Sequence, residues 1–416
     1  MKRIVVHCEQ DLIKVAVLEN NELVEYFTER SSDRQRVGNI YKGKVMNILP
    51  GMQAAFVDIG TERNAFLYID DCIPVQAVHH PDKKPSITSV LSPGQELLVQ
   101  VAKEALGNKG ARVTTHCSIP GRSLVYMPGA DYVGISRKIN ADRERARLRA
   151  IGDSIRKPGE GLIFRTVAEG EGLEALSAEL EDLRNIWKSV VAKAEEHSAP
   201  SLIYRDLDTV PRIVRDLFTE EVEEIVFDEE DKEREARELL AEMSPGWEKR
   251  VKLYRNDLPL FSHYNIYEEL NRAFKRKLWL KSGAYLVVEQ TEALTVIDVN
   301  TGKFTGSVNL ENTVYETNLE AAHEIARIVR LRDLSGIIIV DFIDMEEEEH
   351  RQQIVRHMEQ LFQQDRTRTS VVGWTKLGLL ELTRKKVREP LDTAFFTTCS
   401  HCKGRGKIFT PDFPLL

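Results

Sequence analysis

Two aspartates, Asp298 and Asp341, each stand at the end of an apolar run in this chain of 416 residues. The runs cover residues 294–298 and 336–341 and are rich in Ile, Val and Leu. Two carboxylates brought side by side are hard oxygen ligands, which suit a magnesium ion that also holds a phosphate. Asn300 lies two residues beyond Asp298, so its side chain points to the same side if the strand continues. The candidate catalytic residues are therefore Asp298, Asn300 and Asp341, with Asp298 and Asp341 as magnesium ligands.

The segment between the two runs would bring these carboxylates together. From residue 311 to about residue 334, apolar side chains recur at helical spacing, at Val314, Leu319, Ala322, Ile325, Ala326 and Val329. A strand, a crossover helix and a second strand form two parallel neighbours in one sheet, about 4.8 Å apart. Asp298 and Asp341 would then lie at adjacent carboxyl ends, the edge at which open α/β sheets bind ligands.

The same aspartates have a simpler interpretation. Asp often ends strands because it favours turns, and Asp298 precedes the turn-like segment 300–303. Geometry alone leaves both a metal site and two turn-forming aspartates open. The acidic run 346–349 predicts the start of a helix that ends near Asp365, because acidic side chains favour the positive end of the helix dipole.

Composition indicates a folded protein of several domains. The length predicts roughly two to four domains, and 42% hydrophobic with 30% charged residues is typical of globular proteins. Five scattered cysteines, no signal peptide and no membrane span predict a reducing, cytoplasmic setting. The net charge of −8 argues against a protein that coats nucleic acid without selectivity. The basic runs 275–281 and 384–388 are still candidate phosphate contacts.

Short strands punctuated by glycine predict a small β-barrel. The strand patterns cover residues 38–45, 51–60 and 65–69. They resemble the RNA-binding OB fold, which presents aromatic and basic side chains on an open face where bases stack. Phe56 and Phe66 are candidate stacking residues, with two core phenylalanines as the alternative.

Arg165 and Thr166 are predicted to end a strand over residues 161–166, ahead of the glycine-bearing segment 168–172. A guanidinium and a hydroxyl at such a junction suit a terminal phosphate. From the residues alone, an ordinary surface pair is the simpler interpretation.

Taken in order, several segments resemble the bacterial ribonuclease E/G family over nearly the whole chain. The matching stretches are 39–45, 107–110, 165–166, 297–300, 318–322, 330–334 and 340–345. The resemblance implies a magnesium-dependent endoribonuclease that cleaves single-stranded RNA and leaves 5′-phosphate and 3′-hydroxyl ends. Ribosomal RNA processing, messenger RNA decay or both are the implied roles.

The resemblance also implies roles for individual residues. Magnesium would be held at Asp298 and Asp341, with Asn300 supporting Asp298. Arg165 and Thr166 would bind the 5′-monophosphate of the substrate. Phe56 and Phe66 would line the RNA path.

The implied fold is a multidomain α/β protein with ribonuclease H-like and deoxyribonuclease-like α/β parts, in which an OB-fold RNA-binding barrel is inserted after the first strands. The expected parts are the ribonuclease H-like part at 1–36 and 210–274, the barrel at 37–118, a 5′-phosphate sensor region at 119–209, the catalytic deoxyribonuclease-like domain at 275–396, and a zinc-link motif with the tail at 397–416.

Cys399 and Cys402 are expected to bind zinc. Structural zinc takes four ligands and this pair supplies two, so the same pair of a second chain would complete the site and link a homodimer. Ser400 stands where the family usually has proline, which leaves a free, exposed pair of thiols as the alternative. The chain ends ten residues beyond Gly406, which favours a short, ribonuclease G-like member without a carboxyl-terminal dimerisation domain.

Two other classes of protein stay open. A non-catalytic RNA-binding or ribosome-associated protein would keep the OB face, but the intact Asp298, Asn300 and Asp341 argue against it. A metal-dependent phosphatase or deoxyribonuclease would keep the carboxylates but would have no need of an RNA-type barrel.

Overall fold

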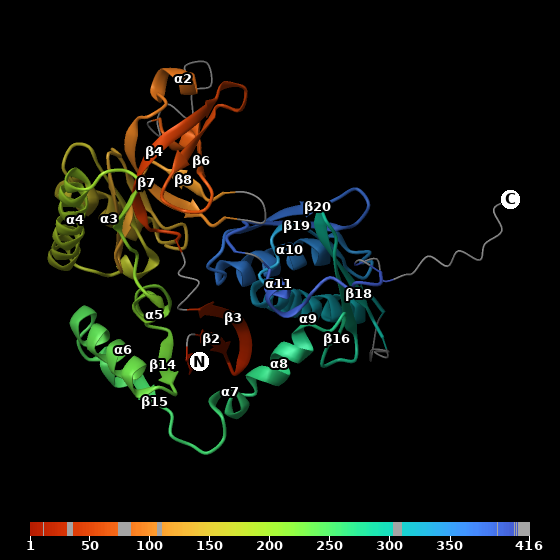
Figure 1. Cartoon of the computed structure of the whole chain (residues 1–416). Helices are drawn as coiled ribbons and strands as arrows, with labels where there is room; N and C mark the ends of the chain where they lie inside the picture. Colours follow the sequence, from red (N-terminus) through yellow and green to blue (C-terminus); the bar gives the residue numbers. More distant parts are fainter. Residues whose placement is uncertain are drawn as a thin grey trace. The chain divides into compact units, whose positions relative to one another are not determined.

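The computed structural model describes residues 1–10, 12–30, 36–73, 85–105, 110–302, 310–388, 390–402, 404 and 406. The chain forms two compact units (Figure 1). The first unit comprises Met1–Thr28, Val222–Glu233 and Arg250–Leu416, and the second comprises Glu29–Glu221 and Arg234–Lys249. The expected stretch 107–109 and most of the tail after Cys402 lie outside the described residues.

A five-stranded sheet of order β15-β14-β1-β2-β3 belongs to the first unit. Its strands are β1 (Lys2–Glu9), β2 (Leu12–Glu19), β3 (Glu22–Arg30), β14 (Val222–Phe227) and β15 (Val251–Leu253). Ile4, Val5 and Val6 of β1 are fully buried, as expected for an apolar run covered on both faces. β14 pairs with β1 in parallel, so a segment from the middle of the chain completes the sheet of the amino-terminal strands.

The second sheet of this unit contains both candidate aspartates. Its six strands lie in the order β16 (Lys277–Trp279), β17 (Tyr285–Gln290), β18 (Leu294–Asn300), β19 (Gly336–Asp341), β21 (Leu380–Arg384) and β20 (Thr369–Trp374). β18 and β19 are parallel neighbours, and α9 (Leu310–Leu331) connects them. This confirms the predicted strand, crossover helix and strand. The flanking antiparallel strands were not predicted.

One face of this sheet packs against helices. Side chains of α9 and of α10 (Glu348–Gln363) share a hydrophobic core with the sheet, including Ile325, Ile354 and Ile297. On the opposite face, Val296 and Ile339 are half-exposed and Ile337 is exposed. The candidate aspartates belong to this more exposed face, because Asp298 alternates with Ile297 and Asp341 with Val340.

A buried charge network joins β3 to α9 within the first unit. The Glu25 carboxylate accepts hydrogen bonds from Arg366 Nε at 3.0 Å and from Arg330 Nη2 at 3.4 Å. Burial alone would raise the pKa of Glu25, but the positive charges of Arg366 and Arg330 outweigh burial and lower that pKa to about 2. Glu25 is therefore ionised at neutral pH, and its charge is balanced inside the fold.

The second unit contains a closed five-stranded barrel. It is formed by β4 (Ile40–Leu49), β5 (Ala54–Asp58), β6 (Ala65–Tyr68), β8 (Arg112–Thr114) and β7 (Glu96–Lys103). Closure follows because β4 pairs with both β5 and β7. A Cβ at Gly43 would lie 2.6 Å from Val57 Cγ1, so the close approach of β4 to β5 requires glycine there. The barrel is the one predicted from the glycine-punctuated strands.

A four-stranded sheet and two helices form the rest of the second unit's core. The strands are β11 (Val133–Ile135), β12 (Glu160–Phe164), β10 (Leu124–Pro128) and β9 (Ile119–Pro120) in sheet order. The helices are α3 (Asp142–Ile155) and α4 (Leu173–Glu196). Leu176, Leu180 and Leu183 of α4 are buried at helical spacing, so one face of α4 packs into this core.

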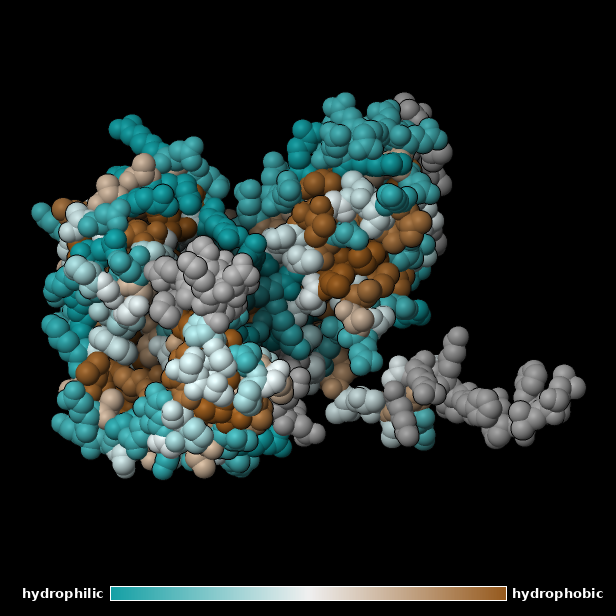
Figure 2. Space-filling view, turned by 90° about the horizontal axis from the view of Figure 1, so that it is seen from above, coloured by the Kyte–Doolittle hydropathy of each residue, from teal (hydrophilic) through white to brown (hydrophobic). Residues whose placement is uncertain are grey.

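The remaining elements are short or connecting. They are α2 (Ile87–Val90), β13 (Ser201–Tyr204), α5 (Thr209–Leu217), α6 (Glu230–Met243), α7 (Leu260–His263), α8 (Ile266–Ala273) and α11 (Asp392–Phe395). On the face in Figure 2, hydrophobic side chains reach the surface in separate patches among hydrophilic ones. Among the described residues, no helix combines the length and the apolar character that a membrane crossing requires.

Candidate active site

Asp298 and Asp341 are direct partners in the register of β18 and β19. Both lie at the carboxyl ends of parallel strands, where neighbouring backbones are about 4.8 Å apart. Asp298 is half-buried and Asp341 is exposed. The structure thus brings the two predicted carboxylates together at one edge of the sheet.

The electrostatics of this pair favour a cation. Burial raises the pKa of Asp341, and the negative charges of Asp298 and Asp344 raise that pKa further. Asn300 Nδ2 donates a hydrogen bond of 2.7 Å to Asp298 Oδ2. One oxygen of Asp298 is therefore oriented by Asn300, as expected from their two-residue spacing.

The donor set is open rather than a closed cage. Within the described ranges, no group of three or more His, Cys, Asp or Glu side chains is arranged to hold a metal ion. Magnesium keeps several waters and often takes only one or two carboxylates from the protein. Two aspartates and one orienting amide fit that ion.

The loop that follows β19 is tied to α9 by residues whose role was not predicted. Asn318 is fully buried; its Nδ2 donates to the Ile343 carbonyl at 2.8 Å and its Oδ1 accepts from the Ile343 N–H at 3.1 Å. Glu311 accepts from the N–H groups of Glu346 and Glu347 at 3.1 and 3.2 Å. The acidic run therefore begins in this loop, and α10 starts at Glu348.

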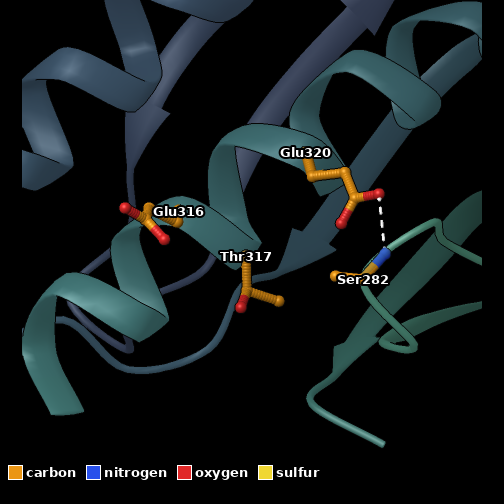
Figure 3. A pocket seen from close by; sticks show the side chains of 4 residues that line it. All are labelled: Ser282, Glu316, Thr317 and Glu320. Carbon is orange, nitrogen blue, oxygen red and sulfur yellow. Dashed lines mark hydrogen bonds between the residues drawn. The ribbon is translucent and has the colours of Figure 1, made fainter. Parts of the chain in front are cut away.

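A cavity of about 270 Å³ lies beside α9 and is lined by Ser282, Glu316, Thr317 and Glu320 (Figure 3). Ser282 donates its N–H to Glu320 Oε1 at 3.2 Å, across the cavity wall. Neither Asp298 nor Asp341 lines this cavity. The cavity is therefore separate from the candidate catalytic aspartates.

Phe56 and Phe66 lie on the outer side of the barrel. They are cross-strand partners in β5 and β6, with ring centroids 5.5 Å apart and an edge-to-face arrangement. Both are half-exposed, whereas their neighbours Val57 and Leu67 point into the barrel core and are fully buried. The two rings therefore form part of the barrel surface and not of its core.

Arg165 and Thr166 follow β12, which ends two residues earlier than predicted, at Phe164. Arg165 Nη1 donates to the Gly121 carbonyl at 2.7 Å, and its Nη2 lies 2.7 Å from an Asp216 oxygen. Thr166 is exposed, and its Oγ1 is 3.0 Å from Ser136 Oγ. Arg165 is thus a positioned guanidinium and not a loose surface side chain.

A second guanidinium, that of Arg122, was missed by the sequence patterns. Its centre lies 4.7 Å from the Trp247 ring centroid. In the described part of the chain, its buried Nη1 has no hydrogen-bond partner. Burial lowers the pKa of Arg122, and the positive charge of Arg165 also lowers it. No periodicity or spacing marks this residue, because it lies in the turn between β9 and β10.

The two predicted basic runs differ in their surroundings. Arg384 is buried and lies 2.7 Å from Asp365, so its prediction as a phosphate contact was wrong. An internal ion pair satisfies its charge. In the other run, Lys277 Nζ lies 3.4 Å from the Tyr285 ring centroid, a cation–π contact on the sheet face that carries the aspartates.

Cys399 is exposed and Cys402 is partly buried. Hydrogen bonds from the backbone of Cys402 and of His401 lower the pKa of the Cys399 thiol. One chain supplies two sulfur atoms here, so zinc binding at this pair stays a prediction.

Comparison with known proteins gives the family. Residues 118–387 match the Ribonuclease E/G family. The chain is 40% identical over 402 residues to ribonuclease G of Escherichia coli (strain K12), covering 95% of this chain and 82% of that protein. It is 41% identical over 382 residues to ribonuclease E of Synechocystis sp., covering 91% of this chain and 56% of that protein. The chain therefore belongs to the ribonuclease E/G family and is an endoribonuclease, a hydrolase that acts on RNA.

Proposed function

We propose that this endoribonuclease cleaves single-stranded RNA at a magnesium site formed by Asp298 and Asp341, and leaves 5′-phosphate and 3′-hydroxyl ends. The observation that carries the proposal is the direct register pairing of the two aspartates at the carboxyl ends of β18 and β19. The open, oxygen-rich donor set and the raised pKa of Asp341 support a cation there.

The chain's own residues would position the reacting groups. Asp298 and Asp341 would hold the ion, and Asn300 would keep Asp298 in one orientation. When bound, magnesium supplies Lewis-acid stabilisation of the phosphate and a water of lowered pKa. The aspartates lie on the more exposed face of the sheet, where a phosphodiester can approach them.

Phe56 and Phe66 are proposed as stacking residues for RNA bases, and Arg165 with Thr166 as the binding site of a 5′-monophosphate. Partial exposure of both rings supports the first assignment. The second is supported by the fixed guanidinium of Arg165 and by the nearby charge of Arg122. The proposed setting is ribosomal RNA processing, messenger RNA decay or both, in the cytoplasm.

The ribonuclease H-like and deoxyribonuclease-like parts, with the domain boundaries expected above, belong to the same proposal. Pairing of β1 with β14 supports joining 1–36 to 210–274. The mixed sheet that holds both aspartates supports 275–396 as the catalytic domain.

One cleavage experiment tests the function and the 5′-end site together. Single-stranded RNA and DNA of equal sequence are incubated with the enzyme and magnesium, the RNA carrying a 5′-monophosphate or a 5′-hydroxyl. We expect cleavage of RNA only, and faster cleavage of the monophosphorylated RNA. Arg165→Ala should remove that preference while leaving cleavage of 5′-hydroxyl RNA unchanged, because a bidentate contact to the phosphate is lost.

Arg165→Lys is the matched control, since it keeps the positive charge but loses the planar guanidinium. This variant should retain part of the preference for 5′-monophosphorylated RNA. Equal cleavage of RNA and DNA would contradict the proposed substrate. An unchanged preference in Arg165→Ala would contradict the 5′-phosphate site alone.

Zinc at Cys399 and Cys402 is proposed to link two chains. Since each chain supplies two sulfurs, we expect about one zinc per two chains, and a dimer content that follows zinc occupancy. Metal analysis and sedimentation of wild type and Cys402→Ser measure both quantities, with Cys72→Ser as the control cysteine variant. A Cys402→Ser protein that remains a zinc-containing dimer would contradict the link.

A further inference from the structure

We propose that Tyr68 and Arg112 form a third base-stacking position on the barrel, beside Phe56 and Phe66. The ligand would be one base of single-stranded RNA with its adjoining phosphate. The inference rests on the proposed function in that the barrel is taken to bind RNA, but it adds two residues to which no role has been assigned.

The strand register places these side chains on one surface. Phe66 and Tyr68 are two residues apart in β6, so both point outward while Leu67 between them is buried. Across the sheet, Phe66 pairs with Phe56 on one side and with Arg112 of β8 on the other. β6 and β8 are neighbouring strands of the barrel in Figure 1.

The rings form a continuous row. Phe56 and Phe66 have centroids 5.5 Å apart, and Phe66 and Tyr68 have centroids 4.5 Å apart, both in edge-to-face arrangements. Tyr68 is the most open ring of the three, with 38% of its surface exposed. A single exposed aromatic residue needs no explanation. An exposed ring that extends a row of half-exposed rings offers another flat surface to the next base of a strand.

Arg112 is fixed over the Tyr68 ring. Its guanidinium carbon lies 4.8 Å from the ring centroid. Arg112 Nε and Nη2 donate to Asp71 Oδ2 at 2.8 and 2.7 Å. Neither of these two hydrogen bonds to Asp71 uses Arg112 Nη1. The Arg112 side chain is 39% exposed. A held guanidinium of this kind can stack on the aromatic ring and still donate to a phosphate.

The electrostatics specify what this position contributes. Asp71 balances the charge of Arg112, so the pair adds little net positive charge to the surface. Stacking, and not counterion release, should therefore dominate its contribution to binding. Loss of Tyr68 should lower the affinity for RNA at every salt concentration while leaving the salt dependence unchanged.

The test measures binding of RNA to the full chain in an Asp298→Asn background, which keeps the RNA intact. Single-stranded RNA oligomers labelled at the 3′ end carry one abasic nucleotide, moved along the sequence, and affinity is read by fluorescence anisotropy. With Tyr68 present, we expect three adjacent positions at which the missing base weakens binding. Tyr68→Ala should weaken binding of intact RNA about five- to tenfold and should abolish the effect at one of the three positions.

Three variants act as controls. Tyr68→Phe should bind as the parent does, whereas Tyr68→Leu, which keeps apolar area without a ring, should behave as Tyr68→Ala. Tyr267→Ala removes a tyrosine of similar exposure on α8 and should leave affinity unchanged. Unfolding curves of all variants establish that the barrel is intact.

An unchanged affinity in Tyr68→Ala, or an equal loss at every abasic position, would overturn the inference. Failure of the proposed function looks different, because it is a lack of RNA cleavage by wild type with magnesium. Three sensitive positions together with no cleavage would leave this stacking position standing and reject the nuclease site.

Discussion

Asp298→Asn is expected to abolish RNA cleavage while leaving RNA binding and the fold nearly unchanged. The substitution keeps the shape of the side chain and removes the charge that would hold magnesium beside Asp341. A bound metal supplies several kcal/mol to a phosphoryl transition state, so the cleavage rate should fall about a thousandfold or more. The measurement is single-turnover cleavage of a 5′-monophosphorylated RNA in magnesium, with affinity for the same RNA determined in parallel.

Glu381→Gln is the matched control for this result. Glu381 belongs to the neighbouring strand β21, where it lies opposite Ile339. The substitution therefore removes a carboxylate from the same sheet face and leaves the aspartate pair unchanged. Its cleavage rate should remain close to that of wild type. Cleavage by Asp298→Asn at the wild-type rate would show that the paired aspartates do not form the reaction centre.

Glu25→Gln should lower the free energy of unfolding at neutral pH by about 3 kcal/mol, because it leaves Arg366 without its carboxylate, while Arg330 keeps its hydrogen bonds to Glu19. The pH dependence has a definite sign. The pKa of Glu25 is lowered to about 2 in the fold, so its contribution is complete above pH ~4.5 and is lost as the pH falls toward 2. In wild type, stability should decline across that window by about 3 kcal/mol more than in the variant.

Denaturant unfolding of both proteins at pH 7 and pH 2 measures this difference. Glu289→Gln is the control, since Glu289 pairs with Arg276 at an exposed position and should change stability by less than about 1 kcal/mol. Equal stability of wild type and Glu25→Gln at pH 7 would contradict the role given to the buried network.

The parts of the fold that the sequence predicted are those set by local patterns. The sequence alone shows the apolar runs of β18 and β19 and the helical spacing of α9. These patterns are enough to bring Asp298 and Asp341 together, because two parallel strands joined by one crossover helix almost always adopt the same right-handed arrangement. The two-residue spacing of Asp298 and Asn300 likewise predicts their contact. Alternation along β6 also directs Phe66 and Leu67 to opposite sides.

The parts that could not be predicted depend on partners distant in sequence. Arg384 stands in a basic run that the sequence marked as a candidate phosphate contact, and only the fold brings Asp365 to it. The sequence around Arg165 indicates an ordinary surface residue, because Asp216, its ion-pair partner in the fold, is distant in sequence. The antiparallel strands β17 and β21 were not predicted. Their sequence patterns are short, and these segments form strands because they pair with neighbouring strands.

The pairing of β1 with β14 affects how the chain is made. Val5 pairs with Val226, so the ribosome must synthesise roughly 200 further residues before β1 meets its second neighbour, β14. At about 5–20 residues per second, this takes about 10–40 s. Throughout that interval, the edge of β1 that pairs with β14 in the folded protein presents unpaired backbone N–H and C=O groups. The barrel, whose strands are all close in sequence, can fold in the meantime, so the pairing of β14 with β1 is a late step of folding.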